Sequence, residues 1–237
     1  EKPLNSIAKK AEKIELIEIK GLNKLEFRER NIFEEHDDHG HDDHKEHGHK
    51  EDKHDDHKED KHDDHEGHAH GEHDPHIWLD PMNAKVILNE MVEHLIENDA
   101  KNASKYKSNL KKALKDIDKL NADVKKELSK STASIVFHDA YQYFEERYDV
   151  NILGAFTVNT DVMPGAEQLA EIREIIEHDK VTCVFSEPQF NPDIIKAVAK
   201  DMNIKTGIVD PLGATLKPGK NLYFDLIRNM SASFKGC

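Results

Sequence analysis

The hydrophobic and polar positions divide the chain into a short first part, a polar tract and a longer second part. Apolar residues recur at helical spacing near the start, which predicts an opening helix. They are Leu4, Ile7, Ala8, Ala11 and Ile14. Residues 15–19 (ELIEI) alternate between polar and apolar side chains, which predicts a strand that ends at Gly21.

Two helices are predicted after the polar tract. Asp80 suits an N-cap and Pro81 the first helical position. The apolar face that follows consists of Ala84, Ile87, Leu88, Met91 and Leu95. A longer helix is predicted from about Ala103 to Ser129, about 27 residues or ~40 Å. Its apolar stripe is Tyr106, Leu110, Ala113, Leu114, Ile117, Leu120, Val124 and Leu128, and its other side is rich in Lys. A coiled coil would need more heptads and a partner segment, so a spine that joins two lobes fits better.

From Ser134 onward, short apolar runs alternate with helical patterns. The predicted strands cover residues 134–137, 150–156, 181–185 and 204–209. The predicted helices cover 140–148, 166–178, a segment that starts at Pro192 with Asn191 as its cap, and 221–234. Such alternation predicts an α/β lobe with a largely parallel sheet.

The polar tract from Glu34 to His76 dominates the composition. It holds 14 of the 17 histidines, 18 Asp or Glu and 5 Lys, so it carries −13 of the chain's formal charge of −14. The sequence HKEDKHDD at 49–56 recurs unchanged at 57–64. Because no periodic apolar face offsets the entropy of ordering the chain, the tract is predicted to be a disordered loop.

The composition of this loop predicts weak metal binding at many places. Neutral imidazole is a good ligand for zinc, copper and nickel, and carboxylates add oxygen ligands and negative potential. The alternatives are a solvated linker of mixed charge and a pH-responsive acidic tract, and the density of histidine favours metal. The predicted weak ligands are His36, His39, His41, His44, His47, His49, His54, His57, His62, His65, His68, His70 and His73.

Several classes of protein find no support in the sequence. No basic patch interleaved with aromatic residues indicates nucleic acid. No apolar run approaches the roughly 18 residues of a membrane span. The zincin pattern HExxH, the GxSxG nucleophile motif, the P-loop and the dinucleotide glycine motif are absent, so an enzyme would need a site assembled from distant residues. The two cysteines, Cys183 and Cys237, fit either free thiols or one disulfide, and their spacing does not decide.

Three predicted strands end in residues that can bind a metal. His138, Glu187 and Asp210 each follow a strand, and ligands of parallel sheets bind beyond the carboxyl ends of the strands. Polar residues also follow strands because they turn or cap the chain, but the repetition favours a shared site. His76 lies where the tract re-enters the folded chain, and its local sequence fits either a loop histidine or a site ligand.

Several motifs are specific enough to indicate a family. They are DPHIWLDP at 74–81, HDAYQYFE at 138–145, CVFSEPQF at 183–190, DPLG at 210–213 and the C-terminal Cys237, with a His- and acid-rich loop just before the first. In these motifs the chain resembles the zinc-uptake solute-binding proteins, the extracytoplasmic receptors of bacterial ABC importers. The resemblance covers essentially the whole chain.

The resemblance implies an α/β fold of two parallel-sheet lobes joined by a long rigid helix, with the metal site in the cleft. We therefore expect a partial N-terminal lobe at 1–102 that contains the disordered loop at 34–75, a connecting helix at 103–130 and a C-terminal lobe at 131–237. Relatives supply a first histidine ligand early in the N-terminal lobe, and no histidine precedes His36 here. The resemblance thus implies a fragment that lacks this ligand and the signal segment, with an incomplete N-terminal lobe.

The resemblance also implies the roles of particular residues. His76 and His138 become zinc ligands, and Asp210 matches an acid that closes the site in some relatives, with Glu187 as a further candidate behind the ligands. Manganese-type relatives tend to carry Glu where His138 stands, so His138 favours zinc. The family pairs the two cysteines, Cys183 with Cys237, which implies an oxidising compartment.

The function expected from this resemblance is that of a receptor rather than an enzyme. It would act as a monomer in the periplasm or on the extracytoplasmic surface, capture Zn²⁺ and deliver it to the membrane permease of an ABC transporter. The alternatives are a manganese or broad divalent-metal receptor of the same family and, from a different class, a His-rich metal buffer.

Deletion of residues 34–71 is expected to remove several weak zinc equivalents and leave one tight equivalent, because interchangeable clusters in a flexible chain bind weakly. Calorimetric zinc titration of the full chain, with and without these residues, measures both classes. The weak binding should decline as the pH falls through about 6.5, since protonated imidazole does not bind metal. Loss of the tight equivalent in a deletion variant that keeps its circular dichroism spectrum would favour the metal buffer.

Overall fold

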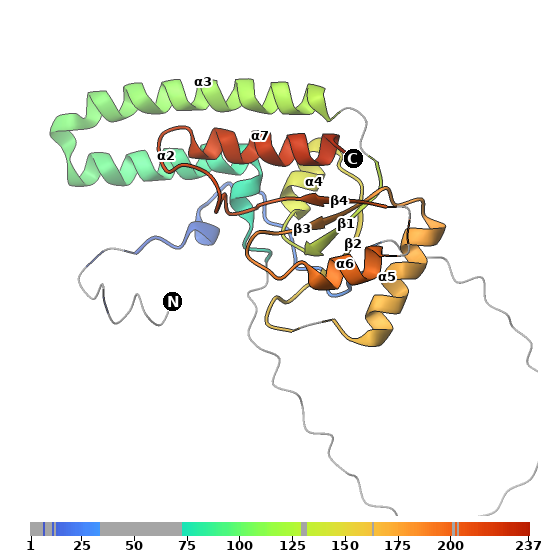
Figure 1. Ribbon diagram of the computed structural model, residues 1–237. Helices are drawn as coiled ribbons and strands as arrows, with labels where there is room; N and C mark the ends of the chain where they lie inside the picture. The colour runs from blue at the N-terminus through green and yellow to red at the C-terminus, as the bar shows by residue number, and fades with distance from the viewer. Residues whose placement is uncertain are drawn as a thin grey trace, which may run out of the picture.

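A four-stranded parallel sheet forms the centre of the computed structural model, which describes residues 7, 11, 13–33, 73–128, 132–162, 164–200, 202 and 204–237 (Figure 1). The strand order is β2-β1-β3-β4. The strands are β1 (Ser134–His138), β2 (Ile152–Thr157), β3 (Cys183–Ser186) and β4 (Lys205–Ile208). All four lie where the hydrophobic pattern predicts them, so the α/β class with a parallel sheet is confirmed. The division into domains at 1–102, 103–130 and 131–237 stays a prediction.

The helices also follow the predicted pattern closely. They are α2 (Pro81–Asn98), α3 (Ala103–Glu127), α4 (Gln142–Tyr148), α5 (Ala166–His178), α6 (Asp193–Ala199) and α7 (Leu222–Lys235). Three short 3₁₀ helices are added, namely η1 (Leu16–Glu18), η2 (Ile77–Leu79) and η3 (Ala100–Asn102). The predicted opening helix lies largely outside the described residues, and the predicted loop lies outside them from residue 34 to residue 72.

The sheet separates two apolar layers. On one face, α4, α7 and the end of α3 pack over Val136 and Phe185, and on the other face α5 and α6 pack over Ile135 and Val184. Neighbouring residues of a strand enter different layers because their side chains point to opposite faces of the sheet. Figure 1 shows α7 and α4 on one side of the strands and α5 and α6 on the other. Burial on both faces explains why these strands appear in the sequence as continuous apolar runs.

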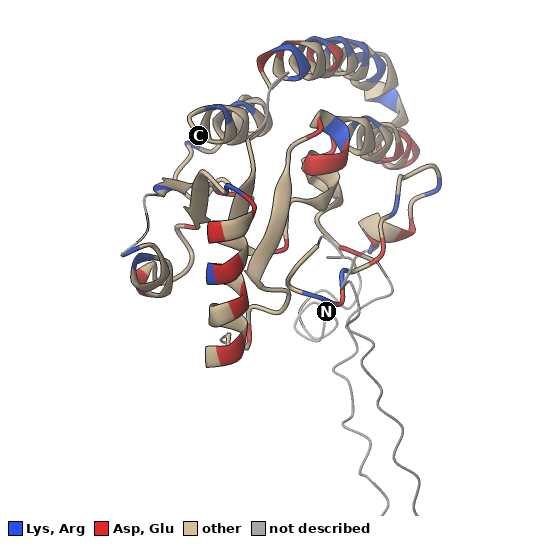
Figure 2. Ribbon diagram, turned by 90° about the vertical axis from the view of Figure 1, so that its right-hand side faces the viewer, with Lys and Arg blue, Asp and Glu red and all other residues tan. Residues whose placement is uncertain are grey.

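The long helix α3 packs against α2 and α7 (Figure 1). Its inward stripe includes the buried residues Ile117, Leu120 and Val124, as the spacing predicts. Lys and Arg colour much of its outward side in Figure 2, whereas the strands of the sheet are almost entirely uncharged. Among the described helices, none combines the length and the apolar character that crossing a membrane requires.

The strand predicted at residues 15–19 is wrong. These residues form the 3₁₀ turn η1, in which the N–H groups of Glu18 and Ile19 donate to the carbonyls of Glu15 and Leu16 at 2.9 and 3.2 Å. A five-residue alternation becomes a strand when a neighbouring strand takes its backbone hydrogen bonds. Within the described part of the chain no strand pairs with this segment, so the backbone bonds to itself.

The segment that follows η1 runs back along the open edge of β2. Ile32 forms an antiparallel bridge with Gly154, and the N–H of Ala155 donates to the Asn31 carbonyl at 2.8 Å. A Cβ atom on Gly154 would lie 2.6 Å from this carbonyl oxygen, so the close approach requires glycine. This contact ties a residue from the first part of the chain to the C-terminal sheet.

The two cysteines form a disulfide, as the resemblance implies. Cys183 is the fully buried first residue of β3, and Cys237 follows α7, with 5.7 Å between their Cα atoms. The bond therefore fastens the last helix to the start of a central strand.

Replacement of both cysteines by alanine is expected to lower the free energy of unfolding by about 4 kcal/mol, because the unfolded chain regains the freedom of a long loop. The cross-linked positions are 54 residues apart. Urea denaturation followed by circular dichroism gives this difference. Addition of a reductant to the wild-type protein is the matched control and should reproduce most of the loss. An unfolding midpoint that neither reductant nor substitution moves would contradict the prediction.

Candidate metal site

The candidate site lies at the point where the strand order of the sheet reverses. β1 lies between β2 and β3, so the chain leaves β1 to one side and returns to the other. His138 is the last residue of β1 and Glu187 directly follows β3. The carboxyl ends of two adjacent parallel strands thus meet at a topological switch point, where open α/β sheets bind their ligands.

His76 reaches this edge from the segment that precedes α2. Its neighbour Asp74 is anchored on both sides, because the Asp74 N–H donates to the Leu25 carbonyl at 2.8 Å and the Tyr143 hydroxyl donates to the Asp74 carbonyl at 2.8 Å. Farther along, the Trp78 indole N–H donates to the Pro211 carbonyl at 2.9 Å. The DPHIW motif is therefore fixed against α4 and against the loop after β4.

The two histidine rings face each other through their Nε2 atoms, which lie 3.5 Å apart. Behind each ring a buried carboxylate contacts Nδ1, with Asp74 Oδ1 at 2.6 Å from His76 and Glu187 Oε1 at 2.7 Å from His138. A carboxylate in this position keeps the proton on Nδ1 and leaves the lone pair on Nε2. Two lone pairs that face each other at this distance repel unless a cation lies between them. The arrangement is therefore suited to binding a cation.

The spacing of the pair suits zinc. Zn²⁺ binds imidazole nitrogen at about 2.0–2.1 Å, so two nitrogens in tetrahedral positions lie ~3.4 Å apart. The observed 3.5 Å between the Nε2 atoms agrees with this value. The rings are also largely shielded, with 16% of the His76 side chain and 12% of the His138 side chain exposed. Two neutral imidazoles favour zinc over hard cations, which prefer oxygen ligands.

The described residues supply this pair and not a complete site. Among them, no group of three His, Cys, Asp or Glu side chains is close enough together to hold a metal ion. Asp210 lies beyond the end of β4, where its carboxylate accepts from the Gln189 amide at 2.7 Å and from the N–H groups of Leu212 and Thr215 at 3.2 and 3.3 Å. Asp210 is thus held as a turn acceptor and is not grouped with the two histidines.

Of the predicted loop ligands, the structure describes His73 alone, and the other twelve lie outside its described residues. His73 forms an isolated antiparallel bridge with Glu26, directly before the anchored Asp74. Residue 73 therefore already belongs to the folded part of the chain.

Sequence reasoning missed Asp74 as the partner of His76. The signal was present, because a carboxylate two residues before a histidine can accept a hydrogen bond from that residue's backbone and from its ring. Asp74 Oδ1 indeed accepts from the His76 backbone N–H at 2.9 Å. Arg28 was missed as well, since nothing in its local sequence indicates a partner more than one hundred positions away.

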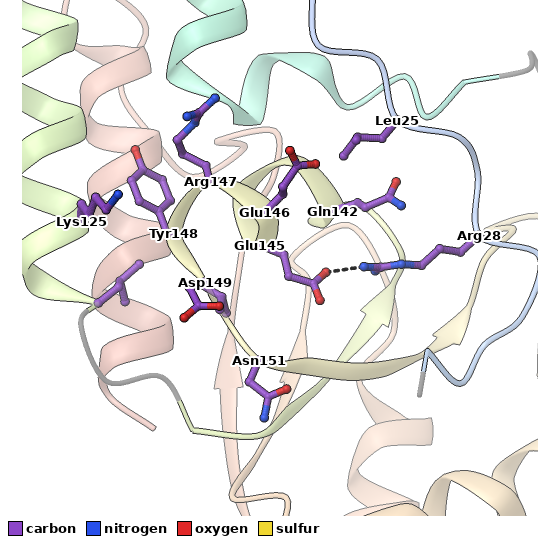
Figure 3. Close-up of a pocket in the computed structure, with 12 residues that line it drawn as sticks. Leu25, Arg28, Lys125, Gln142, Glu145, Glu146, Arg147, Tyr148, Asp149 and Asn151 are labelled. Carbon is purple, nitrogen blue, oxygen red and sulfur yellow. Dashed lines mark hydrogen bonds and ion pairs between the residues drawn. The ribbon is translucent and has the colours of Figure 1, made fainter. Parts of the chain in front are cut away.

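Arg28 bridges two carboxylates, Asp139 and Glu145, beside β1. It donates from Nη1 to Asp139 at 3.1 Å and from Nη2 to Glu145 at 2.8 Å, and its guanidinium lies 3.9 Å from the centre of the Phe33 ring. Figure 3 shows Arg28 and Glu145 in the wall of a pocket of about 1060 Å³, which neither site histidine lines. Burial raises the pKa of Glu145 to about 7, although the Arg28 charge opposes the shift. Burial likewise raises the pKa of Asp139 against the charge of Arg28.

Comparison with known proteins assigns the family. Residues 1–237 match the family model described as ZnuA, zinc-uptake complex component A, periplasmic. This chain belongs to the ZnuA family. The high-affinity zinc uptake system protein ZnuA of Brucella abortus (strain 2308) is 48% identical over 242 residues, which cover 100% of this chain and 72% of that protein. The protein of the same name from Yersinia pestis is 37% identical over 165 residues, which cover 68% of this chain and 52% of that protein.

Solved structures of ZnuA proteins share the fold. A crystal structure of ZnuA superposes with a TM-score of 0.62 at 24% identity and covers 71% of this chain and 61% of that chain. A ZnuA deletion mutant with zinc bound superposes with a TM-score of 0.59 at 25% identity and covers 69% of this chain and 60% of that chain.

Ionisation of Glu145 is expected to make the ZnuA-family chain less stable as the pH rises. Its pKa is higher in the folded protein, about 7, than the usual 4.5. Between these two pKa values the folded state holds a proton that the unfolded state has lost. The contribution of Glu145 to the free energy of unfolding is therefore fully present below the unfolded pKa, and it is lost as the pH rises through about 7. Relative to Glu145→Gln, the wild type should lose on the order of 2 kcal/mol between about pH 4.5 and pH 8.

Urea denaturation of both proteins in the presence of a chelator measures this difference. Glu146→Gln is the matched control, since Glu146 is an exposed neighbour on the same helix. Parallel pH profiles for the wild type and Glu145→Gln would contradict the assignment.

Proposed function

We propose that the chain is the zinc-capturing receptor of an ABC importer. The observation that carries this proposal is the facing pair of His76 and His138, whose Nε2 atoms lie 3.5 Å apart while the buried carboxylates Asp74 and Glu187 contact their Nδ1 atoms. Membership of the ZnuA family supports it, as do the zinc-uptake names of the relatives from Brucella abortus and Yersinia pestis. Under this proposal zinc is cargo.

The proposed donor set favours zinc. Imidazole nitrogen binds Zn²⁺ well, whereas manganese and magnesium favour oxygen ligands. A manganese receptor would be better served by a carboxylate at one of the two positions. Aqueous zinc gives up water for the two histidines, and the remaining coordination positions are open to water or to groups other than the described residues. Asp210 stays a candidate for closing the site, and it would have to exchange its hydrogen bonds with Gln189, Leu212 and Thr215 to do so.

Release follows from the same chemistry. The two ligands are neutral bases, so any proton that reaches Nε2 competes with zinc. Delivery to a membrane permease, a periplasmic location and the lack of an enzymatic role belong to this proposal and are supported by the family description.

His138→Ala is expected to weaken tight zinc binding by more than about 100-fold, because even the loss of a group behind a ligand costs 10–100-fold. Competition titration against a zinc chelator measures the affinity. The experiment should use the variant that lacks residues 34–71, so that weak loop sites do not mask the change. His178→Ala is the matched control, since His178 is an exposed histidine at the end of α5.

An unchanged affinity in His138→Ala would refute the assignment of the site. A protein that binds Mn²⁺ more tightly than Zn²⁺ in the same assay would favour the manganese receptor instead.

A further inference from the structure

The two carboxylates behind the histidines accept different numbers of hydrogen bonds. Asp74 accepts from the His76 backbone N–H at 2.9 Å in addition to the ring. The Gln142 side chain, in the orientation that satisfies its neighbours, also donates to Asp74 Oδ2 at 3.2 Å. For Glu187, the one side-chain hydrogen bond of good geometry within the described residues comes from His138. Glu187 is 3% exposed, so water does little to satisfy its second oxygen.

The Tyr141 ring lies beside His138, whose Nδ1 contacts this under-satisfied carboxylate. Tyr141 is completely buried, and its hydroxyl has no hydrogen-bond partner of good geometry in the described part of the chain. Buried tyrosine hydroxyls ordinarily find a partner. Burial, followed by the charge of Glu187 and its capacity to accept a hydrogen bond, raises the pKa of Tyr141 well above the usual value. The hydroxyl therefore keeps its proton and can act as a donor.

Packing holds the Tyr141 ring in place. It lies edge-on against Phe234 with 6.0 Å between ring centres, and its ring centre is 6.4 Å from that of His138. Phe234 belongs to α7, the helix that the disulfide fastens to β3. The ring is therefore held by its neighbours, and its unpartnered hydroxyl lies within the buried layer beside His138.

We propose that Tyr141 is a positioning residue of the zinc site, whose hydroxyl donates to Glu187 and thereby holds His138 with its Nε2 lone pair toward the metal. This inference rests on the proposed function. When His138 binds a cation, its Nδ1–H becomes more acidic and its hydrogen bond to Glu187 strengthens. A second donor to Glu187 keeps that carboxylate correctly oriented, in the role that Gln142 fills for Asp74.

Tyr141→Phe removes the hydroxyl and keeps the ring. It should weaken zinc binding by about 10-fold in chelator competition, the lower end of the range for groups that orient a ligand. Tyr148→Phe is the matched control, because Tyr148 lies on α4, is also buried and also has a hydroxyl without a partner among the described residues. Its zinc affinity should equal that of the wild type. A Tyr141→Phe affinity within 2-fold of the wild type would overturn the inference and leave the proposed function to the His138→Ala result.

A double-mutant cycle tests whether Tyr141 acts through Glu187. In the background of Glu187→Gln, the substitution Tyr141→Phe should have little further effect, because the carboxylate that it orients is gone. An undiminished 10-fold loss in that background would show a merely structural role and overturn the inference.

Nitrogen-15 NMR of the histidine rings gives a readout that does not depend on zinc. In the metal-free wild type, the His138 signals should report a proton on Nδ1, and Tyr141→Phe should shift them toward a mixture of tautomers. The signals are assigned by their loss in His138→Ala. If the wild type binds no zinc tightly, the proposed function fails, and these spectra still decide the role of Tyr141. Identical His138 signals in the wild type and Tyr141→Phe would overturn the inference that Tyr141 is a positioning residue.

Discussion

Two buried carboxylates orient the histidines of the proposed metal site. Asp74 and Glu187 are almost completely shielded from water, and a charge in such a place is costly unless it is paired and hydrogen-bonded. Each carboxylate contacts Nδ1 of a histidine. This contact favours the tautomers with the proton on Nδ1 and turns both Nε2 lone pairs toward one point. The repulsion between those lone pairs is relieved when a cation binds. The buried carboxylates, by orienting the two rings, therefore favour the metal-bound state.

Helix α4 connects this pair to the rest of the molecule. Tyr143 both accepts from the Leu25 N–H at 3.0 Å and donates to the Asp74 carbonyl. Glu145 pairs with Arg28, and the Arg147 guanidinium binds Asp80 through two hydrogen bonds of 2.7 and 2.6 Å. The HDAYQYFE motif thus combines one proposed ligand, His138, with the contacts that hold the segment of the other proposed ligand, His76, in place. Within this helix of seven residues Tyr143, Phe144 and Tyr148 are buried, whereas Glu145 and Arg147 bind Arg28 and Asp80.

The C-terminal disulfide lies in the same apolar layer as α4 and strengthens this arrangement. Cys183 begins the strand whose far end leads to Glu187, and Cys237 closes the helix whose Phe234 packs against Tyr141 and Phe185. The covalent bond and the aromatic packing therefore act on the elements that carry Glu187. Rigidity behind a ligand matters here because two histidines from separate segments must keep their nitrogens at a metal-binding distance.

The sequence by itself determined the C-terminal architecture, since buried parallel strands require apolar runs and their helices require a 3.6-residue period. It also placed His138, Glu187 and Asp210 at strand ends, because a parallel sheet brings such ends to one edge. The tertiary structure decided which of them meet. His138 and Glu187 touch because β1 and β3 are neighbours, whereas Asp210 follows β4, one strand farther from β1. The strand predicted at residues 15–19 failed for the same reason, because strand pairing depends on a partner that local alternation does not specify. The contacts of Arg28 and Tyr141 join segments far apart in the chain and depend on packing that no local pattern encodes, whereas Asp74 contacts His76 locally.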